Sequence, residues 1–181
     1  MTKIYLTGEE LAGAFPTAVR QDALVALATF PANRLLGRSF SVRVSDEELT
    51  IPYRLHNDLP LIHANSLTAL QQEFASCLLT RHSDGLVREK YLAKIIGVKH
   101  SWIPPFVIQL AGEYVIEILR LIHQNLSVLD QALYAQFFHN NPEFLQKTGQ
   151  RISSYWDCYF RNERREDYVG FKLLGFLQSL R

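Results

Sequence analysis

The sequence predicts a mainly α protein: a compact multi-helix domain of about eight helices with one antiparallel β-hairpin near the N-terminus, over about residues 39–55. Apolar residues recur every three or four positions through most of the chain, which is the spacing of one helix face. Between 39 and 55 they instead alternate with polar residues, as in a half-buried strand. Capping residues, glycines and prolines fall between the helical stretches, where helices begin and end.

Two short helices are expected before the hairpin. Thr7 and Glu10 have the spacing of a capping box, in which each side chain hydrogen-bonds the backbone of the other, so a helix should begin there and end before Pro16. A second helix is expected over residues 17–29, because its apolar residues recur at helical spacing and Pro31 prevents its continuation.

Alternating residues on either side of the stretch 45–48 predict the hairpin. A four-residue connection there places six apolar side chains on one face, in the pairs Val44–Leu49, Val42–Ile51 and Phe40–Tyr53. Pro52 has no backbone N–H to donate, so its strand must present that position to an unpaired side. We expect an isolated two-stranded element, preceded by a turn at Leu35 and Leu36, that packed helices stabilise.

The rest of the chain is expected to be helical. Each helix starts near a serine, aspartate, asparagine or proline, residues that are common at helix N-termini. The expected helices cover residues 66–81, 84–96 and 103–125, then begin again at 127, 142 and 167. No linker divides the chain, so we expect a single domain over residues 1–181, with subdomains 1–65 and 66–181 at most.

Residues 66–110 resemble a HEAT-type helical repeat. The residues that carry the resemblance are Asp84 as a helix cap and the pair that follows it, Val87 and Arg88. The segment departs from the family because Tyr91 or Leu92 stands where a small residue is usual, and no second copy follows at a period near 40 residues. The resemblance implies antiparallel helix pairs and a surface that binds other proteins.

Composition and charge argue against several classes of function. Nineteen basic and eighteen acidic side chains leave a formal net charge of +1, which disfavours nucleic acid or an anionic membrane as the main partner. No apolar run approaches the length that spans a bilayer, and the first residues lack the apolar core of a secretion signal. Cys77 and Cys158 lie in apolar helical patterns, and we expect both to be reduced core thiols. We therefore expect a cytoplasmic protein without a metal or cofactor.

The expected helix 103–125 carries the one pattern that points to catalysis. It is apolar over most of its circumference, but Glu113 and Glu117 lie one turn apart on its narrow polar stripe. Two such carboxylates can bind a metal or transfer protons, and folding can bring a histidine beside them, either His82 or His123. The alternative function is therefore a hydrolase or a metal-dependent enzyme.

The two carboxylates also have a structural explanation. Arg120 stands where the di-metal helix bundles place a histidine, which disfavours a metal site of that type. Ion pairs explain the same carboxylates: Glu117 with Arg120, or Glu113 with Arg88 or Arg151 from a packed neighbour. We therefore assign no catalytic residue in the main interpretation.

The densest group of aromatic and basic residues lies at 151–161. Its Tyr and Trp side chains combine apolar area with a hydrogen-bonding tip, which favours recognition hot spots, although packing in the core is an alternative. We predict a non-enzymatic adaptor or inhibitor-type module that binds another protein, or a second copy of itself. The residues expected to form its binding face are Arg88, Tyr114, Arg151, Tyr155 and Trp156. The arginines at 161, 164 and 165 alternate with acidic residues and are expected in a solvated loop.

Overall fold

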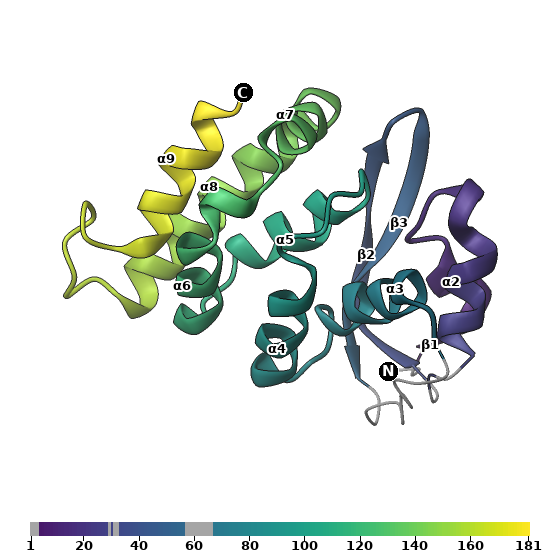
Figure 1. The fold of residues 1–181 in the computed structure, drawn as a ribbon. Coiled ribbons are helices and arrows are strands. Elements are labelled where there is room, and N and C mark those ends of the chain that lie inside the picture. The colour runs from purple at the N-terminus through teal and green to yellow at the C-terminus, as the bar shows by residue number, and fades with distance from the viewer. Residues whose placement is uncertain (1–3, 29, 31–32, 57–66) are drawn as a thin grey trace. The chain divides into compact units, whose positions relative to one another are not determined.

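The computed structural model describes residues 4–28, 30, 33–56 and 67–181, and it confirms a mainly α protein with a small antiparallel sheet (Figure 1). The chain forms two compact units, Met1–Ile95 and Ile96–Arg181. Ser66, where the sequence suggested a subdomain boundary, lies outside the described residues. The helices between it and the second unit belong to the first unit.

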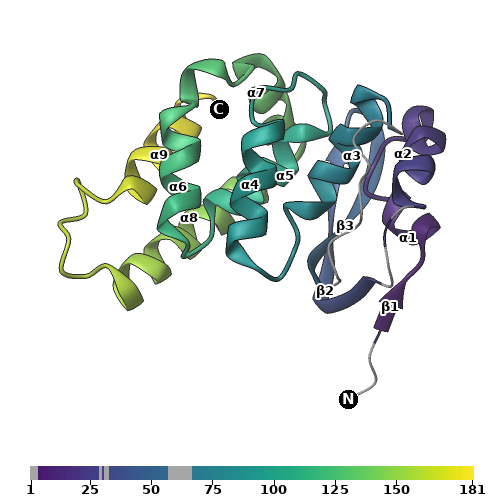
Figure 2. The same ribbon diagram turned by 60° about the horizontal axis from the view of Figure 1, so that its bottom comes forward.

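The first unit combines the sheet with helices. Its strands form one sheet in the order β1-β2-β3. Helices α2 and α3 lie side by side next to the hairpin, and α4 packs on α3 (Figures 1 and 2). The elements are β1 (Ile4–Leu6), α1 (Gly8–Ala12), the 3₁₀ turn η1 (Thr17–Val19), α2 (Arg20–Leu27), β2 (Asn33–Val44), β3 (Glu47–His56), α3 (Ala69–Leu79) and α4 (Gly85–Ile95).

The hairpin forms, but its predicted register was wrong. The connection has two residues, Ser45 and Asp46, because Ser45 adopts a left-handed conformation with φ of 52° and lets the strands pair closer to the turn. The observed apolar pairs nearest the turn are Val42–Leu49 and Phe40–Ile51. An offset of two residues keeps every side chain on its original face, so the alternating pattern is compatible with either register.

The hairpin is also longer than predicted and is not isolated. Leu35 and Leu36 lie in β2 rather than in a turn, and β1 pairs with that end of β2, from Ile4 opposite Leu35 onward. Three exposed or half-buried residues give β1 too short a pattern to recognise from the sequence. Pro52 lies in β3, which is an edge strand of the sheet, next to a register shift at which Gly37 adopts φ of 84°.

Capping residues define how two helices of this unit begin. Thr7 and Glu10 form the predicted capping box at α1, where the Thr7 N–H donates to Glu10 Oε2 at 2.7 Å. At α3 the cap is Thr68, paired with Gln71, and not the predicted Ser66. Thr29 and Pro31, expected at the end of the second helix, lie outside the described residues.

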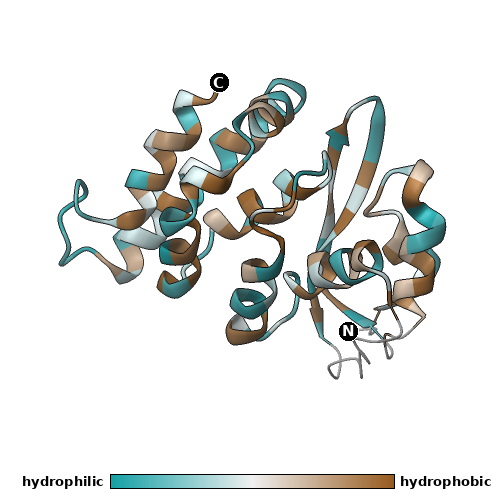
Figure 3. Cartoon of the chain, in the orientation of Figure 1, coloured by the Kyte–Doolittle hydropathy of each residue, from teal (hydrophilic) through white to brown (hydrophobic). Residues whose placement is uncertain are grey.

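The second unit is all helical within the described residues. Helix α8 contacts α5, α7 and α9, and α6 also packs on α9. All nine residues of α5 are buried, and this helix is hydrophobic along most of its length in Figure 3. The elements are α5 (Ile103–Ala111), α6 (Ile116–Gln124), the 3₁₀ turn η2 (Leu126–Val128), α7 (Gln131–Asn140), α8 (Pro142–Tyr159) and α9 (Val169–Ser179). None of the described helices is long and apolar enough to cross a bilayer.

Glu47 links the hairpin to the turn η1 and should make the first unit sensitive to acid. The N–H and hydroxyl of Thr17 donate to Glu47 Oε2 at 2.9 and 2.6 Å, and these hydrogen bonds hold the pKa of Glu47 below its ordinary value. A carboxyl group whose pKa is lower in the folded state than in the unfolded state stabilises the fold at pH values above its unfolded-state pKa. This contribution to the free energy of unfolding is lost as the pH falls through the folded-state pKa. Replacing Glu47 with glutamine should therefore destabilise the protein at pH 7, and this destabilisation should become smaller as the pH falls toward 3.

Urea unfolding of both proteins across this pH range measures the difference. Glu48→Gln is the matched control, because the Glu48 side chain is exposed and forms no hydrogen bond or ion pair with the described residues. A Glu47→Gln effect of equal size at pH 7 and pH 3 would contradict the assigned role.

Candidate interaction surface

The predicted helix 103–125 is two helices, α5 and α6, so this prediction was wrong. The break begins at Gly112, which the side chain of Arg151 approaches closely: a Cβ at this position would lie 3.2 Å from Arg151 Cδ. Glycine is a poor helix former, and here it also admits the neighbouring side chain. The buried α5 and the apolar face of α6 together contain the same apolar residues as one long helix, so hydrophobicity did not reveal the break.

The break separates the two carboxylates that the alternative enzyme required. Glu113 lies in the connection and is 3% exposed, whereas Glu117 is exposed in the first turn of α6. His123 lies half-buried in the last turn of α6, and His82 is a buried residue of the first unit whose Nδ1 accepts a hydrogen bond from the N–H of Asp84. The predicted polar stripe is therefore interrupted, because Glu113 is buried whereas Glu117 is exposed on α6. No group of three potential metal-binding side chains occurs among residues 4–28, 30, 33–56 and 67–181.

Arg88 was predicted on the binding face, but it is only 2% exposed. Its Nη1 donates to the carbonyl oxygens of His82 and Ser83, both at 2.9 Å. These bonds hold the segment that leads into α4, whose first turn is also capped by Asp84 through the N–H of Leu86 at 2.8 Å. Arg88 is therefore a structural residue of the first unit, and its assignment to a binding face is corrected.

Arg151 connects two helices of the second unit. It is half-buried, and its Nη1 donates to Gln109 Oε1 on α5 at 3.0 Å, while its aliphatic stem lies against Gly112. This arginine therefore holds α8 against α5. Its place on the binding face stays a prediction.

Tyr114 and Tyr155 do lie together, and Tyr159 joins them. The ring centroids are 5.7 Å apart for Tyr114 and Tyr155, 5.8 Å for Tyr114 and Tyr159, and 6.2 Å for Tyr155 and Tyr159. Tyr114 is 53% exposed and Tyr159 65% exposed, and Tyr155 is half-buried. We call these three residues the tyrosine cluster. The connection before α6 supplies one ring and the last two turns of α8 supply the other two.

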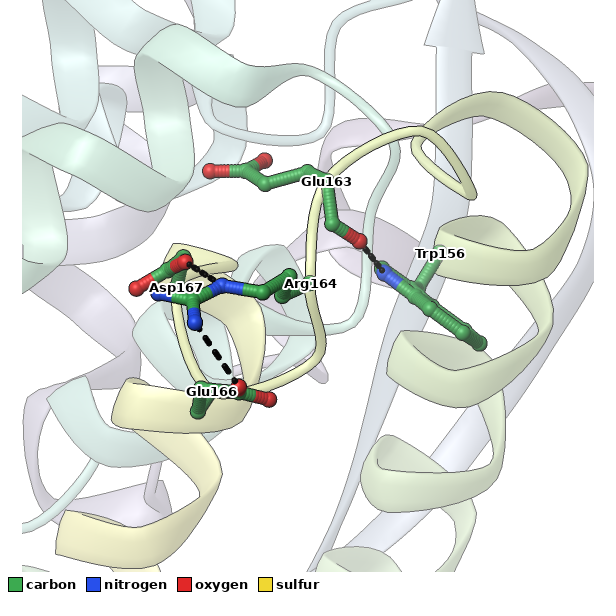
Figure 4. Close-up of polar contacts among 5 residues, drawn as sticks. All are labelled: Trp156, Glu163, Arg164, Glu166 and Asp167. Atoms are coloured by element: carbon green, nitrogen blue, oxygen red, sulfur yellow. Dashed lines mark hydrogen bonds and ion pairs between the residues drawn. The ribbon is translucent and has the colours of Figure 1, made fainter.

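Trp156 lies next to the cluster in sequence but packs toward α9. Its indole N–H donates to the carbonyl oxygen of Glu163 at 3.0 Å, in the loop that joins α8 to α9 (Figure 4). Its ring meets Phe171 edge to face at 5.9 Å, and the guanidinium of Arg165 lies over both rings, 5.3 Å from the Trp156 centroid and 4.5 Å from the Phe171 centroid. Trp156 therefore anchors the loop after α8.

Two residues of this region were not among those predicted to form the binding face. Tyr159 follows Tyr155 by four positions, a spacing that places both rings on one side of α8. Arg165 was assigned to a solvated loop together with its charged neighbours. Nothing in the sequence distinguishes it from Arg161 and Arg164, because its contact with Trp156 and Phe171 depends on how the loop folds.

A groove of about 560 Å³ lies between the N-terminal half of α8 and the C-terminal half of α9, and none of these aromatic residues lines it. Its lining includes three glutamines and Ser153, but no histidine or carboxylate side chain. A serine without a base in reach is not activated as a nucleophile. The groove residues are Leu145, Gln146, Gly149, Gln150, Ser153, Leu174, Gln178 and Arg181.

Comparison of the chain with protein-family models, curated proteins and solved structures found no match. The fold and the surface just described therefore define the protein only as a mainly α protein with a small antiparallel sheet and an exposed tyrosine cluster. The resemblance of residues 66–110 to a HEAT-type repeat stays a prediction.

The two cysteines should differ sharply in reactivity. Cys158 is exposed, which corrects its predicted place in the core, whereas Cys77 is buried. Burial, and secondarily the charge of Glu73, raises the pKa of the Cys77 thiol well above its ordinary value. Ellman's reagent should therefore modify one thiol per native chain and two in denaturant, and Cys158→Ser should abolish the native reaction. A native reaction that persists in this variant would contradict the burial of Cys77.

Proposed function

We propose that this protein is a non-enzymatic interaction module that binds another protein through the tyrosine cluster. The proposal rests on one observation. The rings of Tyr114 and Tyr159 contact each other and Tyr155, yet both Tyr114 and Tyr159 remain exposed to solvent. Tyrosine side chains supply a large contact area with few rotatable bonds, and their hydroxyls add directed hydrogen bonds. Such residues dominate binding energy at protein interfaces.

We do not propose a hydrolase or a metal-dependent enzyme. Its two carboxylates lie on different segments, one buried and one exposed, and the groove between α8 and α9 has no acid–base pair in its lining. A homodimer that uses the same cluster is a variant of the interaction proposal. In that variant the partner is a second copy of the chain.

The proposal places the protein in the cytoplasm. Cys158 is an exposed free thiol, and exposed thiols stay reduced in the cytosol but tend to oxidise in secretory compartments. The near balance of acidic and basic side chains supports a protein partner over nucleic acid.

The test compares a double variant, Tyr114→Ala with Tyr159→Ala, with wild type in quantitative affinity capture from a native lysate. Tyr5→Ala is the matched control, because Tyr5 is also 53% exposed but lies in β1 of the first unit. We expect wild type and Tyr5→Ala to capture at least one protein in equal amounts. The double variant should capture about tenfold less of this protein, or none.

Sedimentation of the three proteins covers self-association. A dimer of wild type and Tyr5→Ala that dissociates in the double variant supports the homodimer variant. Circular dichroism must show equal helix content in all three proteins. Equal capture and equal oligomeric state would overturn the proposed function.

A further inference from the structure

The loop that joins α8 to α9 contains three arginines, of which two form ion pairs. Arg161 Nη2 lies 2.7 Å from Asp157. Arg164 Nε lies 2.7 Å from Asp167, and Glu166 lies 3.6 Å from Arg164 (Figure 4). The loop appears as a hydrophilic segment in Figure 3. Its charges are therefore mostly balanced within the loop itself.

Arg165 differs from both neighbours. Its exposed side chain forms no ion pair or hydrogen bond with any other residue in the part of the chain that the structure describes. Instead the guanidinium lies 4.5 Å from the centroid of Phe171 and 5.3 Å from that of Trp156. Stacking of this kind holds the planar group while its N–H donors, which lie in the plane, remain available.

The aromatic support of Arg165 is itself fixed. The Trp156 ring is held by its hydrogen bond to the Glu163 carbonyl and by edge-to-face contact with Phe171, which belongs to α9. An arginine held on a fixed support loses less conformational entropy on binding than a free surface arginine. The site is therefore organised before a ligand arrives.

We propose that Arg165 binds a single carboxylate side chain of the protein partner. The planar guanidinium matches a carboxylate through two parallel hydrogen bonds, and it is the cation here without an acidic neighbour in contact. This inference rests on the proposed function, because it names the chemistry of the partner that binds near the C-terminal end of α8.

The local charge favours a carboxylate over a phosphate. From Asp157 to Asp167 the chain has three arginines and four carboxylates, so the loop as a whole has a slight negative charge. A phosphate group carries nearly two negative charges and is repelled more strongly by Glu163 and Glu166 than a singly charged carboxylate is. A phosphorylated partner is therefore the disfavoured source of the anion.

The test selects peptides from a displayed random 12-residue library on immobilised wild-type protein. Selected peptides should share an aspartate or glutamate at one position. Replacing that peptide residue with glutamine should lower the affinity about tenfold or more, and so should Arg165→Gln in the protein. Combining the two changes should lower the affinity little further than either change alone. Arg161→Gln is the matched control and should change affinity less than twofold, because Arg161 already pairs with Asp157.

The outcomes separate this inference from the proposed function. Suppose that the tyrosine double variant no longer binds the selected peptides, but that these show no carboxylate preference or bind Arg165→Gln normally. This result overturns the role of Arg165 and leaves the proposed function standing. A phosphoserine version that binds tenfold more tightly than the carboxylate version overturns the choice of ligand. Failure to select any peptide above the buffer control overturns both proposals. Binding that the tyrosine double variant retains but Arg165→Gln loses overturns the role of the tyrosine cluster and supports that of Arg165.

Discussion

Replacing Gly170 with alanine is expected to lower the free energy of unfolding by about 2 to 3 kcal/mol, because the new methyl group has no space. Gly170 is buried at the second position of α9, and a Cβ there would lie 2.4 Å from Tyr168 Cε1 and 3.0 Å from Ile152 Cγ2. Both contacts are well below ordinary van der Waals separation. The substitution should push α9 away from α8.

Tyr168 cannot easily move to relieve this overlap. Its ring is fully buried and lies between Phe160 and Phe171, with centroid distances of 5.1 and 5.8 Å. Burial, and secondarily the charge of Glu163, raises the pKa of Tyr168 to about 12. Because Phe171 also supports Trp156, displacement of Tyr168 should change the environment of Trp156 as well.

Gly175→Ala is the matched control for this prediction. Gly175 lies in the same helix, and a Cβ at its position has no atom within 4 Å. Alanine should therefore stabilise the helix by about 0.5 to 1 kcal/mol. Urea unfolding followed by tryptophan fluorescence measures both changes, and equal stabilisation by the two substitutions would show that Tyr168 has room to move.

Replacing Arg88 with methionine is expected to lower the free energy of unfolding by about 2 to 4 kcal/mol. Methionine keeps most of the apolar stem but removes the donor that serves the carbonyl oxygens of His82 and Ser83. A buried carbonyl without a donor costs about 1 to 3 kcal/mol. The loss should concentrate in the first unit, because the same segment pairs with β3 through the Ser83 N–H and the Leu55 carbonyl at 2.7 Å.

Lys90→Met is the control for this prediction, since Lys90 lies exposed on the same helix, with its ammonium 5.6 Å from the centroid of the Tyr91 ring. Its effect should stay within about 0.5 kcal/mol. Amide hydrogen exchange should show faster exchange at Leu55 and Ser83 in Arg88→Met than in wild type. Unchanged exchange at both amides would contradict the role of Arg88 in holding this segment.

Local patterns predicted most elements because their causes are local. The capping box at Thr7 and Glu10 needs only residues three positions apart, and the hairpin needs only alternation along the chain. The register was wrong by two residues because alternation repeats every two residues and cannot distinguish the two alignments. The strand β1 was missed because its pairing with β2 joins segments about thirty residues apart.

The candidate site was predicted only in part, for a related reason. Tyr114 and Tyr155 were named from residue type, and the structure places them in one cluster. Arg88 and Arg151 were named by the same reasoning, but they bind backbone carbonyls and Gln109 within their own units. An arginine has the same chemistry in each place, so its neighbours alone decide whether it is structural or available.

Hydrophobic spacing and capping residues act within a few positions, so they predicted the mainly α class, the presence of a hairpin and the position of most helices. Contacts between distant segments fix where the long apolar stretch breaks, which arginines make structural hydrogen bonds and which aromatic rings meet at the surface. At Gly112, Arg165 and Tyr159, the deciding neighbour comes from another segment of the chain. Such contacts depend on which segments pack together, and the residue pattern of a single helix does not predict this packing.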